Sequence, residues 1–296
     1  MRQISNLRIM QSTSLTGLVP FNVQEIFQTS GIYYGVNGQS KNIIKADRKR
    51  LKNGNGFVFA TYGAGKSMFV KDEIGKLYLT TNDDFIIIDP EAEYYKAFHN
   101  LNCQEVKIST STNNYINPFE VYGKVTNEDL ANKVDFVISI IDQSINGEVT
   151  PRQKSIISRV IMNIYKPLMK GKTDVMPTMK SFYEELKKQK EEEALDLALS
   201  MEIFVEGTLN IFSHQTNVDM KNRMMIYNIH DLGKQLWSIG MFVMLENITS
   251  RIEENRKKGK NTWIYKFICY FQKRILPCIF LGYGSVFVNT KALQRE

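Results

Sequence analysis

Short apolar segments rich in Val, Ile, Phe and Tyr alternate along the chain with longer segments in which apolar residues recur at helical spacing. The short segments predict β-strands, because branched and aromatic side chains suit the extended backbone. Strands that alternate with helices are typical of a parallel sheet with crossover helices. We therefore predict an α/β fold with a mainly parallel sheet, whose strands are 56–59, 85–88, 106–108, 224–229 and 262–265.

A long helical region separates the third and fourth predicted strands, from Asn127 to about Phe204. Pro151 suits the first turn of the second helix there, and residues 187–193 form a charged connection or helix face. Two sets of apolar residues at helical spacing predict core-facing helices rather than a site. These sets are Leu130, Val134, Val137, Ile138 and Ile141, and Ile156, Ile157, Val160, Ile161 and Ile164. We predict a helical subdomain inserted into the α/β core.

The clearest chemical motif follows the first predicted strand, where residues 56–67 read GFVFATYGAGKS. Glycine lets the backbone close around an anion at a helix N-terminus, so this pattern predicts a phosphate-binding P-loop. Lys66 would reach the β- and γ-phosphates of ATP and act in catalysis, and Ser67 would ligate Mg²⁺. The predicted ATP-binding residues are Thr61, Tyr62, Gly63, Ala64, Gly65, Lys66, Ser67 and Met68. The alternative is a glycine-rich turn without a ligand.

The residue before the loop and the helix after it add two further expectations. Ala60 stands where the full motif has glycine, and its methyl group is expected to weaken the loop at worst. The helix that follows is predicted over 67–78, with Met68, Phe69, Ile74 and Leu77 available for its buried face.

A second candidate lies in residues 85–94, FIIIDPEAEY, where an apolar strand delivers acids at its carboxyl end. Open α/β sheets bind their ligands at this edge. Asp89 would hold Mg²⁺ through water, and Glu91 would orient the attacking water as a catalytic residue. The alternative is that these acids shape a turn and cap the following helix. Arg223, near the fourth strand, has two interpretations as well: a solvated arginine, which we favour, or a sensor of γ-phosphate across a subunit interface.

Composition excludes few classes of function. The net charge is +7 and the pI is near 9.1, but only 48–52 and 256–260 are densely basic, so a solvated surface is favoured over a DNA-binding one. Cys103, Cys269 and Cys278 have no metal-ligand spacing, and their odd number argues against a disulfide framework. We find no signal peptide and no uninterrupted transmembrane segment, which predicts a cytoplasmic protein.

Taken together, these segments resemble the conjugative-transfer ATPases of type IV secretion systems, within the FtsK/HerA-like motor superfamily. The resemblance extends from the N-terminus to about Tyr265. It is carried by LVPFNVQEIFQ (18–28), ADRKRLKNGNGFVFATYGAGKS (46–67), IIIDPEAEYY (86–95), STNNYINPF (111–119), LNIFSHQTNVD (209–219) and IHDLGKQLWSIGM (229–241). This series is far more specific than a lone P-loop.

The resemblance implies a RecA-like core with a helical insertion and ATP turnover that drives pilus or DNA transfer. It also implies a place at the inner face of the membrane, with a homo-oligomer and other type IV secretion subunits as partners; DNA is a further candidate partner. The predicted regions are a lead-in (1–55), the first part of the core (56–126), the insertion (127–205), the second part of the core (206–265) and an aberrant tail (266–296). We expect the chain to be the motor half of such a protein, truncated at both ends.

One departure from the family pattern concerns the Walker B strand, which in the family reads Thr-Trp, about three apolar residues and then Asp-Glu. Here Thr262, Trp263 and two further residues are followed by Lys266, Phe267 and Ile268, so the acids are missing. Without a carboxylate base, we expect γ-phosphate cleavage to fall by orders of magnitude.

The tail changes composition abruptly, which suggests a shift of reading frame. With plausible codons, residues 283–296 can be rewritten as LWKRVRKYKGITTG, which resembles the basic segment expected after Walker B; the nucleotide sequence of the gene tests this. The C-terminal part of the core would then be missing. Three functions stay open: an active motor, a module that binds nucleotide without hydrolysing it, and a non-functional remnant.

Overall fold

The computed structural model describes residue 11 and residues 24–61, 63–109, 112–121, 125–145, 147–207, 210–268 and 284–289. It divides the chain into two compact units, residues 1–53 and 54–296. The prediction of a shifted reading frame over residues 283–296 therefore concerns a segment that lies mostly outside the described residues.

The first unit contains a β-hairpin that the sequence pattern did not predict. Strand β1 (Ile32–Val36) pairs antiparallel with β2 (Ile43–Ala46). Gly31 adopts a φ of 101°, and a Cβ atom built there would lie 2.1 Å from the carbonyl oxygen of Ala46. Only glycine fits this close approach of two backbones. A short 3₁₀ helix, η1 (Arg48–Arg50), follows the hairpin.

The second unit is built on a six-stranded sheet whose strand order is β3-β8-β7-β4-β6-β5. The strands are β3 (Gly56–Val58), β4 (Asp84–Asp89), β5 (Gln104–Lys107), β6 (Met224–Asn228), β7 (Thr262–Ile268) and β8 (Gly284–Asn289). Strands β4, β5, β6 and β7 are parallel, whereas β8 pairs antiparallel with both β3 and β7. The predicted α/β class and mainly parallel sheet are confirmed, and all five predicted strands form. Strand β8 was not predicted.

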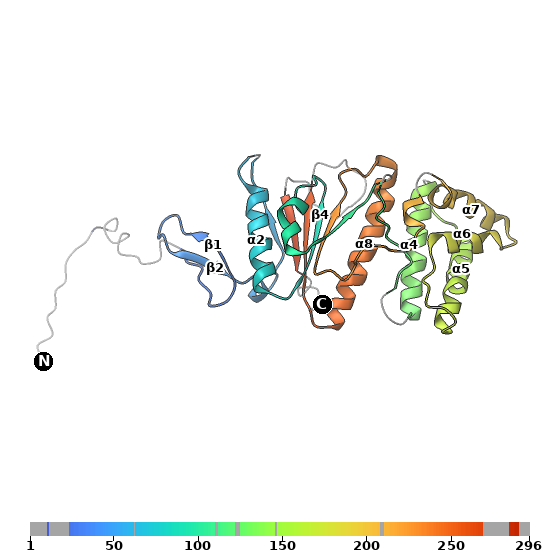
Figure 1. Ribbon diagram of the computed structural model, residues 1–296, viewed down its shortest axis with the longest axis horizontal. Helices are drawn as coiled ribbons and strands as arrows, with labels where there is room; N and C mark the ends of the chain where they lie inside the picture. The colour runs from blue at the N-terminus through green and yellow to red at the C-terminus, as the bar shows by residue number, and fades with distance from the viewer. Residues whose placement is uncertain are drawn as a thin grey trace, which may run out of the picture. The chain divides into compact units, whose positions relative to one another are not determined.

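Strand β4 is buried along its whole length, between helices on both faces of the sheet. Helix α2 (Lys66–Thr80) covers one face and α8 (Lys234–Lys257) covers the other (Figure 1). Because side chains alternate along a strand, Ile86 and Ile88 join the core on the α8 side, whereas Phe85 packs edge-on against Tyr78 of α2. The parallel strands therefore have an apolar layer on each face.

Helix α2 forms where the P-loop pattern predicted it, but its predicted buried face is partly wrong. Ile74 and Leu77 are buried, together with Val70. Met68 and Phe69 are 72% and 38% exposed. Both lie in the first turn of the helix, next to the loop, whereas the residues that reach the sheet lie further along the helix.

The predicted helical insertion forms four helices: α4 (Asn127–Ile145), α5 (Pro151–Met169), α6 (Met179–Lys187) and α7 (Glu192–Val205). Thr150 caps α5 through a reciprocal pair of hydrogen bonds with Gln153, and Pro151 occupies the first turn as predicted. Buried Lys133 of α4 donates to the carbonyl oxygen of Pro118 at 3.0 Å and pairs with Glu246 of α8 at 2.7 Å. This pair ties the bundle to the α/β core.

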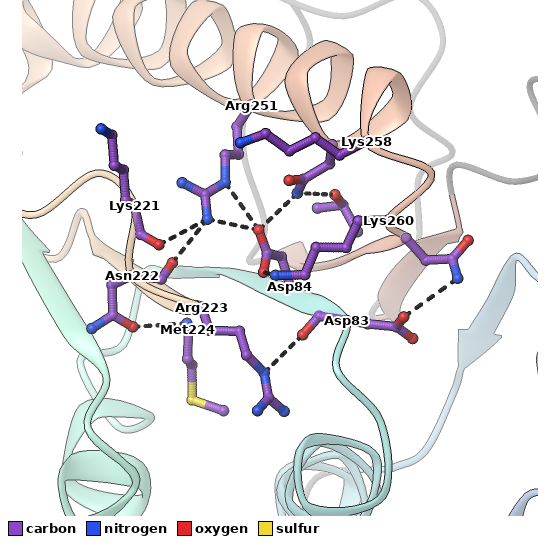
Figure 2. A network of polar contacts seen from close by, with 12 residues as sticks. Asp83, Asp84, Lys221, Asn222, Arg223, Met224, Arg251, Lys258 and Lys260 are labelled. Carbon is purple, nitrogen blue, oxygen red and sulfur yellow. Dashed lines mark hydrogen bonds and ion pairs between the residues drawn. The ribbon is translucent and has the colours of Figure 1, made fainter. Parts of the chain in front are cut away.

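A network of polar contacts fixes the amino end of β4 (Figure 2). The Asp84 side chain is 2% exposed and pairs with Arg251 of α8 at 2.7 Å and with Lys260 at 2.5 Å. Asn255 donates to the same carboxylate at 2.7 Å. The neighbouring Asp83 accepts a hydrogen bond from the indole nitrogen of Trp263 in β7 at 2.8 Å. Helix α8 and strand β7 are thereby held at one end of β4.

Arg223, which precedes β6, belongs to the same end of the sheet. It donates to the carbonyl oxygens of Tyr78, Thr81 and Asp83, and its guanidinium lies 3.9 Å from the centre of the Tyr78 ring. The guanidinium is thus engaged within its own chain, and the interpretation as a solvated arginine is wrong. This end of β4 is opposite the end that carries Asp89.

We expect Arg251→Ala to lower the free energy of unfolding by about 3 kcal/mol, because it removes one partner of a buried carboxylate. The matched control is Arg256→Ala, an exposed arginine on the same helix, with an expected change within about 0.5 kcal/mol. Urea unfolding followed by circular dichroism measures both. Equal losses in the two variants would contradict this role for the buried pair.

Candidate functional site

The loop between β3 and α2 has the backbone of an anion-binding turn. Gly63 and Gly65 have φ values of 77° and 84°, in the left-handed region that favours glycine. The amide of Ala64 donates to the carbonyl oxygen of Thr61 at 3.2 Å, which closes the turn. A Cβ atom at Gly63 or Gly65 would meet nothing within 4 Å. The glycines are thus required by the backbone conformation rather than by close packing.

Helix α2 begins at this loop without a side-chain cap, and Gly65 is its N-cap. The first amides of a helix have no acceptor within the helix, and its dipole favours negative charge there. Lys66 and Ser67 are half-buried in this first turn, and Met68 is exposed. The geometry therefore fits a phosphate group. Of the predicted binding residues, Tyr62 lies outside the described residues.

Strand β4 places Asp89 at the carboxyl end of the sheet, on the same face as Phe85 and therefore on the side of α2. Asp89 is 1% exposed, and its two carboxylate oxygens accept hydrogen bonds from the backbone amides of Glu91 at 3.2 Å and Tyr94 at 2.8 Å. Burial raises the pKa of Asp89, although these amide hydrogen bonds act in the opposite direction. The carboxylate thus shapes the turn over residues 90–94, which was the structural alternative. A role in holding Mg²⁺ stays a prediction.

Tyr94 connects this turn to the P-loop helix. It is 1% exposed, and its hydroxyl is close to the side chain of Ser67. Burial and the nearby Glu93 and Asp89 carboxylates raise its pKa, so the hydroxyl keeps its proton. Lys71 of α2 lies 4.9 Å from the centre of the Tyr94 ring and pairs with Glu93 at 3.0 Å. Spacing in the sequence could not reveal these contacts, because they join two separate elements.

Glu91 lies on the exposed side of the same turn, two residues after Asp89. The turn includes Ala92 at a positive φ of 55°. The structure places Glu91 near Asp89 along the chain, and its role with an attacking water stays a prediction.

The carboxyl end of β7 is the neighbour of Asp89 in the sheet. Strands β4 and β7 pair in register up to Ile88 and Lys266. Continuing that register by one residue sets Phe267 beside Asp89. The side of the site where the resemblance implies the Walker B acids therefore carries Phe267 and Ile268. Among the described residues, no three His, Cys, Asp or Glu side chains are grouped so that they could hold a metal ion.

Comparison with known proteins places these features in a family. The sequence model of the family described as "Helicase HerA, central domain" matches residues 56–267. Among solved structures, the chain is similar to VirB4 of Thermoanaerobacter pseudethanolicus, with a TM-score of 0.65 and 23% sequence identity. That alignment covers 79% of this chain and 66% of the VirB4 chain. No curated protein sequence matches the chain.

We expect Asp89→Ala to lower the free energy of unfolding by about 2 kcal/mol, because two buried amides lose their acceptor. Asp89→Asn should cost less, since the amide oxygen can still accept one of the two hydrogen bonds. Asp72→Ala, at an exposed position of α2, serves as the control and should change stability by no more than about 0.5 kcal/mol. Thermal or urea unfolding gives the three values. An unchanged stability of Asp89→Ala would show that the turn does not depend on this carboxylate.

Proposed function

Because the chain belongs to the family described as "Helicase HerA, central domain", we propose that it is the ATP-binding motor domain of a conjugal transfer ATPase of a type IV secretion system. The observation that carries this proposal is the backbone of the P-loop, in which left-handed Gly65 is the N-cap of α2 and Lys66 and Ser67 occupy the first turn. Turnover of ATP would drive the transfer of DNA or protein.

The coarser assignment rests on the comparisons themselves: the chain contains a HerA-like P-loop ATPase motor domain with the fold of VirB4. The chain spans 66% of the VirB4 chain that it resembles. The activity, substrates and partners of a whole conjugation ATPase are therefore part of our proposal.

Each residue of the loop has a defined task in this proposal. The backbone amides of residues 63–68 bind the β-phosphate, and Lys66 neutralises the β- and γ-phosphates. Ser67, through its hydroxyl, and Asp89, through its carboxylate, would hold Mg²⁺. Bound Mg²⁺ supplies charge compensation for the phosphates. Glu91 orients water on the exposed side of the turn.

A second candidate function is nucleotide binding without hydrolysis. The observation that favours it is the pair Phe267 and Ile268 at the end of β7, where acids would be needed to activate water. Such a module would act by holding nucleotide within an assembly of active subunits. ATP affinity without release of phosphate distinguishes it from an active motor.

Partners and location complete the proposal. The basic surface would contact DNA, and the domain would act as a homo-oligomer or with other type IV secretion subunits, in the cytoplasm at the inner face of the membrane. The support for this is the family resemblance. Within the described part of the chain, no helix has the length and apolar character needed to cross a membrane.

We expect Mg²⁺-ATP to raise the melting temperature of the chain, because a ligand that binds only the folded state stabilises it by about 2.7 kcal/mol at 100 times its Kd. Lys66→Ala should abolish this rise. Lys76→Ala removes a lysine further along the same helix, which pairs with Asp72, and should keep the rise. Differential scanning fluorimetry measures all three. A wild-type chain that melts cooperatively but ignores Mg²⁺-ATP would exclude both candidate functions.

We further expect Tyr94→Phe to weaken the dependence of ATP binding on Mg²⁺, because the Ser67 side chain loses a polar neighbour. Binding of ATP in EDTA should not change. Tyr95→Phe, at the adjacent and 38% exposed tyrosine, is the matched control. The measurement is the melting temperature in saturating ATP over a series of Mg²⁺ concentrations. Identical Mg²⁺ midpoints for the two variants and the wild type would contradict a role for Tyr94.

A further inference from the structure

Helix α7 has apolar residues on its outer side as well as its inner side. Its inner side is buried in the bundle through Leu197, Met201 and other apolar residues. On the outer side, Leu195, Leu199 and Ile203 are 56%, 64% and 45% exposed. They are spaced four residues apart and therefore form one stripe along the helix, which we call the α7 stripe. A continuous exposed stripe of large apolar side chains is a candidate contact surface.

The charges of α7 are all of one sign. It carries Glu192, Glu193, Asp196 and Glu202 and has no lysine or arginine. Glu192 lies three residues before Leu195, and Glu202 lies three residues after Leu199, so both border the α7 stripe. A partner that covers the stripe must accordingly bring apolar side chains with a basic border.

Helix α5 of the same bundle presents that chemistry. Its charged residues are Arg152, Lys154, Arg159 and Lys166, and it has no acid. Met162 and Met169 are 57% and 49% exposed. Lys166 lies four residues after Met162 and three residues before Met169, so all three residues are on the same side of the helix. We call Met162, Lys166 and Met169, with the adjacent Lys170, the α5 face.

Complementarity between the two helices is already used within the chain, between the first half of α5 and the start of α7. Arg159 pairs with Glu191 at 2.6 Å, and Arg152 approaches Glu193 at 3.4 Å. The α7 stripe and the α5 face are exposed, because the opposite sides of both helices are packed in the bundle. Within one chain the α5 face thus leaves the α7 stripe uncovered.

We propose that the α7 stripe of one copy of this chain docks on the α5 face of a second copy. Leu195, Leu199 and Ile203 would pack against Met162 and Met169, whose flexible side chains adapt to irregular surfaces. The acidic border of the stripe would meet Lys166 and Lys170, which gives an apolar centre with a charged rim. The contact joins two different surfaces, so each copy keeps one of each surface available for further copies. This inference is independent of nucleotide binding.

Charge reversal on each side provides the test. One variant, Glu192→Lys/Glu202→Lys, changes only the border of the α7 stripe, and the other, Lys166→Glu/Lys170→Glu, changes only the α5 face. We expect the wild type to associate with increasing concentration in sedimentation velocity. Each variant alone should associate at least about tenfold more weakly than the wild type, because like charges then face each other. An equimolar mixture of the two variants should recover the association, because every contact between unlike copies is again complementary.

The control matched to Glu192→Lys/Glu202→Lys is Asp72→Lys/Glu253→Lys. It makes the same change in net charge at exposed positions of α2 and α8, and it should associate like the wild type. Leu199→Arg tests the apolar centre at a position 64% exposed, where the fold should tolerate it; it should abolish association while leaving the melting temperature unchanged. A wild type that stays monomeric overturns the proposal, even if it binds a basic amphipathic peptide at the stripe. So do variants that associate as well as the wild type, or a mixture that does not recover.

Discussion

Two buried carboxylates, one at each end of β4, set the arrangement on which the rest of the second unit depends. A buried charge without partners is far less stable than one that is paired and hydrogen-bonded. Asp84 therefore requires Arg251 and Lys260, which fix α8 and the approach to β7. Asp89 requires the backbone amides of residues 91 and 94, which fix the turn beside the P-loop helix. The first residue of β4 thus fixes neighbouring elements of the sheet, and its last residue fixes the turn at the candidate site.

The position of the P-loop depends on the same strand, because helix α2 packs against β4. Helix α2 is held on β4 by apolar contacts such as Tyr78 with Phe85, and its far end is tied down by Arg223 through the carbonyl oxygen of Tyr78. The beginning of the helix is held differently, by Lys71, which pairs with Glu93 and lies over the ring of Tyr94. The loop itself needs few contacts, because its conformation is set by two glycines. A rigid helix and an open loop are what binding of an anion requires.

Local features were predictable from the sequence, and contacts between distant elements were not. The apolar run that forms β4 and the glycines around Lys66 carry their own physical signals, so strand, loop and helix follow from a short window. Met68 and Phe69 were assigned to a buried face because helical spacing does not show where the supporting sheet ends. Arg223 was taken as solvated because its acceptors are main-chain carbonyls about 140 residues earlier in the chain, which no spacing reveals. Tyr94 escaped notice for the same reason.

The same distinction separates binding from hydrolysis in this fold. The groups that would hold phosphate come from one continuous segment, whose backbone forms them as soon as β3 and α2 are in place. The groups that would activate water must come from neighbouring strands, β4 and β7, which are far apart in sequence and meet only in the sheet. Substitution at the end of β7, where Phe267 and Ile268 stand, leaves the P-loop backbone untouched. A chain of this kind would therefore keep the geometry of the P-loop whatever residues stand at the end of β7.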